Sequence, residues 1–164
     1  MVDSTGDLRR YLIEPYVGVS AYAFDTPLEQ FLAAEVTPER IERQADATFV
    51  QFKACQCIFD SSSRLREVSL IPGSCVAEMR GQEILRVGPE GPVLDLSSLL
   101  KWDPEPREEV GFLVFFGLGL WTTGFHDGDE AQLSLGAFRR GAFDDMIDAR
   151  VWRPEERPSD DDCD

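Results

Sequence analysis

The chain has 164 residues, enough for one hydrophobic core and short for two, so a single domain is expected. Hydrophobic residues make up 43% of it, which predicts that it folds. Its 31 Asp and Glu against 16 Lys and Arg give a formal net charge of -15, which argues against direct nucleic-acid binding because phosphate backbones are bound through Lys and Arg.

The first half of the chain shows no secretory signal, since residues 1–7 have neither a basic start nor an apolar run, and a cytoplasmic location is expected. Residues 11–24 mix aromatic, β-branched and small side chains, which predicts an extended segment or a short strand. Thr26 stands at the N-cap of a capping box, so a helix is predicted from Pro27 to Glu35.

Strands are predicted after this helix. Residues 48–59 are rich in aromatic and β-branched side chains and predict a strand or a strand pair. Turn-forming residues at 60–63 separate them from a further strand at 65–71. Residues 79–87 predict an additional short strand or a hairpin, and the Gly/Pro cluster at 88–92 interrupts the pattern.

After this cluster the same order returns. Asp95 is placed to cap a short helix whose leucines share one face, and residues 111–121 predict a buried strand or pair of strands. The latter stretch is too short for a membrane span, which needs roughly 18 apolar residues, so no membrane partner is expected. Asp127-Gly128 favours a tight hairpin, and residues 131–138 predict the closing strand.

The predicted fold class is therefore α+β, an antiparallel sheet with short helices on one face. Two tandem helix-strand-strand-strand halves fit the pattern, with pseudo-repeats at about 17–72 and 93–138 of a single domain spanning 1–152. Residues 153–164 are Pro-rich and hold six acidic residues and two arginines, which predicts a disordered acidic tail. The rest of the acidity either keeps the protein soluble or steers a basic partner.

Four cysteines, Cys55, Cys57, Cys75 and Cys163, are expected to be reduced thiols. Cys55 and Cys57 stand two residues apart, so on a strand their side chains point to one face. No second pair follows at zinc-site spacing. Burial as small apolar side chains is the favoured interpretation.

His126, the only histidine, stands beside Asp127, Asp129 and Glu130 in a predicted turn. A surface or capping role is the favoured interpretation, contact with a partner is the second, and general-base or metal chemistry is the third. Zinc ligands are scarce and the calcium-loop spacing is missing, so no metal site is predicted.

No other motif carries chemistry. Gly117-Leu118-Gly119 lacks the further residues of a phosphate-binding loop, and its glycines are better explained by a bulge or the close approach of another element. The serines at 61–63 have no nucleophile-elbow pattern around them. The sequence therefore predicts no catalytic residue and no cofactor, and a binding protein is favoured over an enzyme.

Aromatic and acidic side chains gather in two stretches, which are the candidate partner-binding residues. Aromatic anchors within an acidic rim are typical of a face that binds a basic protein. Core packing is the alternative for each aromatic residue taken singly. The candidates are Trp121, Phe125, His126, Asp127, Asp129 and Glu130 in one stretch, and Trp102, Asp103 and Glu105 in the other.

Residues 17–29 and 111–127, with their Val17-Gly18-Val19 and Gly124-Phe125-His126-Asp127 segments, resemble small bacterial cytoplasmic proteins. Many of these are similar to immunity proteins, which neutralise antibacterial toxins delivered by contact-dependent or type VI secretion. The resemblance covers roughly residues 11–143, and its motifs are structural. The twofold helix-then-strands order is also similar to the tandem architecture of the beta-lactamase inhibitor protein, where a sheet face grips a partner.

The leading hypothesis is therefore an immunity-like inhibitor that binds a cognate toxin, expected to be basic, by direct protein contact. A small-molecule or regulatory binding module, with a pocket between helix and sheet, is the alternative. A hydrolase using His126 with neighbouring carboxylates ranks third. The sequence does not distinguish a monomer from a dimer.

Overall fold

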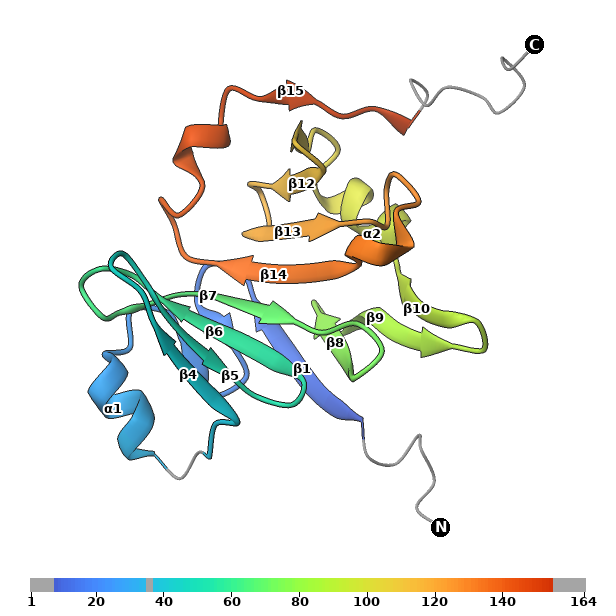
Figure 1. The fold of residues 1–164 in the computed structure, drawn as a ribbon. Helices are drawn as coiled ribbons and strands as arrows, with labels where there is room; N and C mark the ends of the chain where they lie inside the picture. Colours follow the sequence, from blue (N-terminus) through green and yellow to red (C-terminus); the bar gives the residue numbers. More distant parts are fainter. Residues whose placement is uncertain (1–7, 35–36, 155–164) are drawn as a thin grey trace.

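A computed structural model describes residues 8–34 and 37–154 of the chain (Figure 1). Strands dominate it, and the only two α-helices among the described residues are short, so the predicted α+β class is confirmed. The α-helices are α1 (Leu28–Ala33) and α2 (Leu96–Trp102), and two 3-10 turns are η1 (Glu130–Gln132) and η2 (Asp144–Met146).

The strands form two sheets. The larger one contains β4 (Arg40–Arg43), β5 (Thr48–Gln51), β6 (Cys55–Phe59), β7 (Leu65–Leu70), β11 (Arg107–Glu109), β12 (Phe112–Phe115), β13 (Leu120–Thr123), β14 (Ser134–Phe138) and β15 (Arg150–Val151). The smaller one contains β1 (Arg9–Glu14), β2 (Gly18–Val19), β3 (Tyr22–Ala23), β8 (Cys75–Met79), β9 (Gln82–Gly88) and β10 (Gly91–Leu94).

The larger sheet is antiparallel throughout, in the order β15-β11-β12-β13-β14-β7-β6-β5-β4. The smaller sheet has the order β10-β9-β8-β1-β2-β3, and β1 pairs with β8 in parallel. One core cluster joins inward-facing residues of both sheets, such as Ile13 and Leu135, with Phe31 of α1 and Leu99 of α2. Both helices therefore pack on the same side of the larger sheet.

In chain order, α1 precedes the meander β4 to β7, and α2 precedes the meander β11 to β14. The last strands of the two meanders pair antiparallel, from Leu135 opposite Leu70 to Phe138 opposite Glu67. Figure 1 shows the two helices near opposite ends of the long sheet. Each meander has four strands, one more than the sequence pattern predicts, because β4 and β11 are short and polar and carry no alternation.

The two helices differ in how well their ends were predicted. Asp95 caps α2 as expected, since its Oδ1 accepts the Ser98 N–H at 3.1 Å. The capping box of α1 was wrong: Pro27 is the N-cap without a side-chain bond, and the Thr26 hydroxyl donates to the Ala23 carbonyl at 2.7 Å. The predicted end of α1 at Glu35 lies outside the described residues.

The tight hairpin predicted at Asp127-Gly128 was also wrong. β13 and β14 do pair antiparallel, but residues 124–133 connect them through η1. The reason is local. The Asp127 carboxylate accepts the Asp129 N–H, and the Asp129 carboxylate accepts the Ala131 N–H. These backbone N–H groups therefore bond to side chains and not to a neighbouring strand. The closing strand accordingly begins at Ser134 and not at Ala131.

Other local predictions are confirmed. A hairpin turns at Arg80 and Gly81, and the Gly/Pro cluster at 88–92 becomes the turn between β9 and β10. Gly119 lies at φ 64° with the Phe138 carbonyl and the Tyr16 ring close to where a Cβ would be, as the predicted close approach requires. Cys55, Cys57 and Cys75 are fully buried, whereas Cys163 and residues 155–164 of the predicted tail lie outside the described part.

Candidate functional site

A groove of about 490 Å³ lies between the β11–β12 turn and the loop at 124–133. Its lining includes three of the predicted partner-binding residues. We call it the β12 groove and define it by Val110, Phe112, Trp121, Thr123, Asp127 and Asp129. Neither Lys nor Arg is among the described residues that line it, so its polar rim is acidic.

Trp121 forms the floor of the β12 groove and is 6% exposed. Phe112 packs against it nearly edge-on, with the ring centroids 5.4 Å apart. The indole lies over Gly136, the residue opposite it on β14, and a Cβ at that position would overlap the ring. Gly136 is therefore required by the indole, and Trp121 belongs to a packed cluster as well as to the groove.

Val110 stands at the lip of the groove and is 91% exposed. It forms with Gly111 a two-residue turn between Glu109 and Phe112, and the two turn residues have φ of 50° and 82°. A turn with both residues at positive φ is the type I′ turn, which favours Asn-Gly. A β-branched residue in this region is strained, at a cost of roughly 1–2 kcal/mol.

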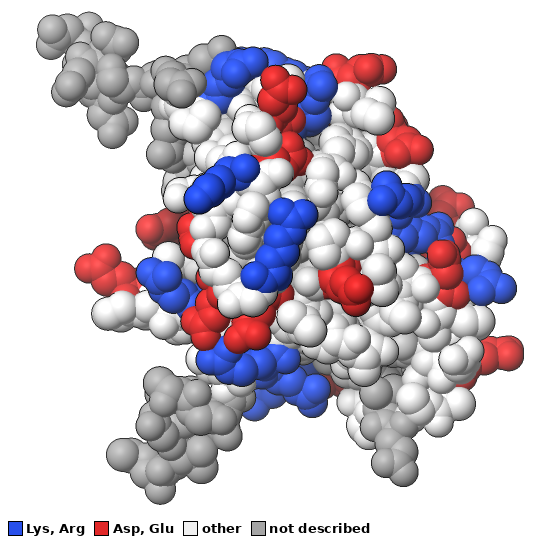
Figure 2. All heavy atoms as spheres, turned by 180° about the vertical axis from the view of Figure 1, so that it is seen from behind, with Lys and Arg blue, Asp and Glu red and all other residues white. Residues whose placement is uncertain are grey.

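The acidity of the β12 groove is local. On the face seen from behind, acidic and basic side chains are interspersed (Figure 2). The described residues hold 22 acidic and 15 basic side chains, so their net charge is -7, less than half of the total. The placement of Asp127 and Asp129 on the groove is therefore better evidence for the kind of partner than the total charge is.

His126 is not on the surface, and its predicted surface or capping role was wrong. Its side chain is 0% exposed and Nε2 lies 2.8 Å from Oε2 of Glu108 on β11. The other oxygen of Glu108 lies 3.5 Å from the Arg150 guanidinium on β15. The bonded partner of His126 is thus Glu108, and not Asp127 or Asp129 as the hydrolase hypothesis supposed.

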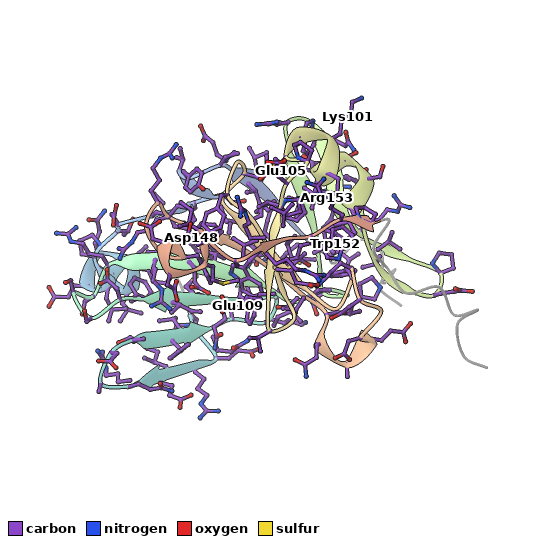
Figure 3. The ribbon with its side chains drawn as sticks, turned by 90° about the horizontal axis from the view of Figure 1, so that it is seen from above. Lys101, Glu105, Glu109, Asp148, Trp152 and Arg153 are labelled. Carbon is purple, nitrogen blue, oxygen red and sulfur yellow. The ribbon has the colours of Figure 1, made fainter. Side chains whose placement is uncertain are left out.

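A second pocket lies on the other side of this segment. We call it the α2 pocket; it measures about 290 Å³ and is lined by Leu96, Ser97, Leu100, Phe125, His126, Trp152 and Pro154. Trp152 meets the His126 ring edge-on, with centroids 5.6 Å apart. Figure 3 shows Trp152 on the C-terminal segment, with Arg153, Glu105 and Lys101 toward α2.

The residues of the second predicted stretch make contacts within the fold. Trp102 is half-buried with the Arg80 guanidinium 5.2 Å from its ring centroid. Asp103 accepts the Gly117 N–H at 2.9 Å and so holds the turn between β12 and β13. Glu105 is exposed and lies 4.0 Å from Arg153. These residues do not line either pocket.

The structure thus separates the first predicted stretch. Trp121, Asp127 and Asp129 line the β12 groove, Phe125 and His126 line the α2 pocket, and Glu130 is exposed on η1 outside both linings. Sequence reasoning missed Val110, Glu108 and Trp152. The only local signal was Val110 before Gly111, where a hairpin turn favours Asn. The partners of His126 come from β11 and from the residue directly after β15.

The buried thiols are not a reactive site. The Cys57 thiol beside Cys55, with Tyr11 nearby, lowers the pKa of Cys55 to about 7 against the effect of burial. The hydrogen bond between the Cys57 and Cys55 thiols raises the pKa of Cys57, and burial raises it further. Both side chains are fully enclosed in the core, so solvent reagents do not reach them.

Glu67 on β7 is the buried acid on the outer face of the larger sheet, opposite Phe138. Burial raises its pKa, opposed by Arg66, whose Nε lies 3.3 Å away. The Trp121 N–H has no hydrogen-bond partner among the described residues, yet it is near enough to oppose the rise as well. A buried, ionised Glu67 destabilises the fold.

We expect Glu67→Gln to stabilise the protein at pH 7, on the order of 1 kcal/mol. Because the folded-state pKa is raised, the folded protein keeps the Glu67 proton over a range where the unfolded chain has lost it. Stability therefore falls as pH rises through that range, and the advantage of Gln disappears below the usual pKa of glutamate. Urea unfolding at pH 7 and pH 3 measures this, with exposed Glu90→Gln as control; a benefit equal at both pH values contradicts it.

No three or more His, Cys, Asp or Glu side chains within 8–34 and 37–154 are placed to hold a metal ion together. No helix in the same ranges has the length and apolarity to cross a membrane. Fold and sites together define an α+β protein with an acidic sheet groove and a separate apolar pocket. Comparisons with protein-family models, curated proteins and solved structures find no match for this chain.

Proposed function

We propose that the protein is a binding protein that takes a basic segment of a partner protein into the β12 groove. The observation that carries this proposal is Val110, a strained and almost fully exposed valine at the lip of an acidic groove. In keeping with the sequence resemblance, the partner would be a bacterial toxin that the protein neutralises by direct contact.

Folding does not account for Val110. Its side chain is 91% exposed, so it adds little to the core, and its backbone favours another residue. Strain of this kind persists where the surrounding structure enforces it and is characteristic of ligand-contacting positions. An exposed apolar side chain beside half-buried Phe112 offers a partner an apolar anchor.

The charges of the groove determine the kind of partner. Asp127 and Asp129 stand on its rim, with no cation among the described lining residues to neutralise them. A Lys or Arg side chain that crosses the rim would pair with these carboxylates. Acidic rims of this kind raise association rates at low salt more than they raise affinity. A basic protein segment is therefore the complementary occupant.

We expect Val110→Asn to separate binding from folding. The change makes an Asn-Gly type I′ turn, so the free energy of unfolding should rise by about 1 kcal/mol. Partner affinity should fall by roughly tenfold as the apolar anchor is lost. Urea unfolding and calorimetric titration measure the two effects. Val87→Asn is the control, since Val87 is exposed on β9 away from the groove; unchanged affinity of Val110→Asn overturns the role of Val110.

The partner is tested with purified toxin domains encoded beside this protein. We expect one of them to bind tightly, and the Asp127→Asn/Asp129→Asn variant to slow association and weaken its dependence on salt. The matched control is Asp144→Asn/Asp145→Asn, which removes the same charge at η2 outside the groove. If no neighbouring toxin binds, or if the two double variants behave alike, the proposal fails.

A further inference from the structure

We infer that two copies of this chain associate through the free edge of β4, so that their larger sheets join into one continuous sheet across a twofold axis at Ile41. β4 is the last strand of the larger sheet, at the end far from β15, and no other described strand than β5 pairs with it (Figure 1). All four of its side chains are exposed. This inference goes beyond the proposed function, because β4 contributes no residue to the β12 groove.

The backbone groups on the open edge of β4 belong to Ile41 and Arg43. Directly after β4, the Gln44 N–H donates to the Ala47 carbonyl across the β4–β5 turn over 2.8 Å. Hydrogen-bonded residues alternate along an antiparallel pair, so every second residue counted back from Gln44 bonds to β5. The N–H and C=O groups of Ile41 and Arg43 therefore point away from the sheet, where an added strand can bond to them.

The order of charges along β4 selects one antiparallel register for two copies. For the open-edge groups of both copies to meet, the twofold axis must pass through a residue and not between two residues. An axis at Arg40, Glu42 or Arg43 would bring two like charges directly opposite each other, which destabilises a strand pair. An axis at Ile41 instead places Arg40 opposite the second copy's Glu42. It also places Glu39 opposite the second copy's Arg43, so every charged pair across the axis has opposite signs.

The side chains on both faces of β4 fit this pairing. Arg40 and Glu42 share one face, where Nη2 lies 3.5 Å from Oε2, and their side chains are 72% and 48% exposed. A second copy brings the same two residues beside them in reversed order, so charges of alternating sign surround the axis. Ile41 lies on the other face beside buried Val50 and is 40% exposed. Ile41 of the second copy would cover it.

Charged residues at a sheet edge usually prevent pairing with another chain. They do so when like charges meet as two copies approach. In β4 the signs reverse about Ile41, so the residues that keep the edge soluble also attract a second copy in one register. The same chain supplies this matching order of charges, and a second copy is therefore the occupant that fits.

Sedimentation equilibrium of the full chain, from micromolar to millimolar concentration, tests the association. The mass should rise from the 18.4 kDa of one chain toward twice that value. Arg40→Glu and Glu42→Arg should each weaken association at least about tenfold, because each creates two like-charge pairs across the axis. Arg86→Glu is the control, since it makes the same change of charge as Arg40→Glu on an exposed residue of β9 in the smaller sheet, and it should leave association unchanged.

Mixing the two variants distinguishes this register from any other. An equimolar mixture of Arg40→Glu with Glu42→Arg should associate again, because every charged pair across the axis then has opposite signs. The double variant Arg40→Glu/Glu42→Arg should associate by itself for the same reason, whereas Ile41→Lys, which brings two ammonium groups to the axis, should stay monomeric. If a single variant does not fold, the double variant and Ile41→Lys still decide. A chain that is monomeric at millimolar concentration, a dimer that survives both single variants, or a mixture that stays monomeric overturns the inference.

Discussion

Replacing Phe59 with alanine is expected to lower the free energy of unfolding by about 4 kcal/mol, within the range of buried Phe truncations. Phe59 ends β6, is fully buried, and meets the Phe31 ring of α1 edge-on with centroids 5.1 Å apart. Phe31 also contacts the rings of Phe52 and Tyr22. The truncation therefore removes core packing and the main attachment of α1 together.

The attachment matters because α1 has only six residues. A helix of that length is not stable by itself in water, and its two buried residues, Leu28 and Phe31, hold it on the sheet. Urea unfolding measures the loss, and backbone amide exchange in α1 should accelerate more than that in α2. Phe49→Ala on β5 is the control, since Phe49 is only half-buried. An equal loss from both variants contradicts the central role assigned to Phe59.

The parts of the fold that could be predicted are those that depend on residues close together in the sequence. Residues 65–71 lie between turn formers at 60–63 and 72–73, and β7 occupies Leu65–Leu70. Asp95 followed by leucines at helical spacing predicts α2 together with its cap. In each case the side chains that decide the structure are within a few residues of one another, so local pattern is sufficient.

Pairing between distant segments could not be predicted in this way. β1 lies parallel to β8, with Arg9 opposite Cys75, and no local pattern specifies that partner. Polar β4 has no buried residue and is a strand because it pairs with β5. Thr26 had the residue type for a cap, but the turn at Ala23 offered its hydroxyl a different acceptor. Tertiary context decided the two strand pairings, whereas the Thr26 hydroxyl found a local acceptor only three residues away that the cap pattern does not describe.

The candidate site shows the same division. Closeness in sequence grouped the candidates among residues 121–130 and suggested one surface. Alternation alone would leave Trp121 and Phe125, four residues apart, on the same side of the sheet. However, β13 ends at Thr123 and Gly124 at φ 83° redirects the chain, so the two side chains pack in different clusters. One predicted surface thus became two separate pockets. Trp152, which follows β15, lines the second, and Glu108 on β11 bonds to His126.

Replacing Gly136 with alanine is expected to lower the free energy of unfolding by about 3 kcal/mol, the upper part of the range for overpacked cores. The added Cβ would overlap the Trp121 indole, and that ring is confined by Phe112 and by neighbouring Val114. Urea unfolding measures the loss. In the Trp121→Leu background the same change should cost about 2 kcal/mol less, because the overlapping ring is gone.

Gly88→Ala provides the matched control, since a Cβ there meets a methyl of exposed Val93 at 3.1 Å, which can move. Similar losses for the two glycines, or none recovered with Trp121→Leu, would contradict the packing explanation. Displacing the Trp121 floor should also weaken binding in the β12 groove.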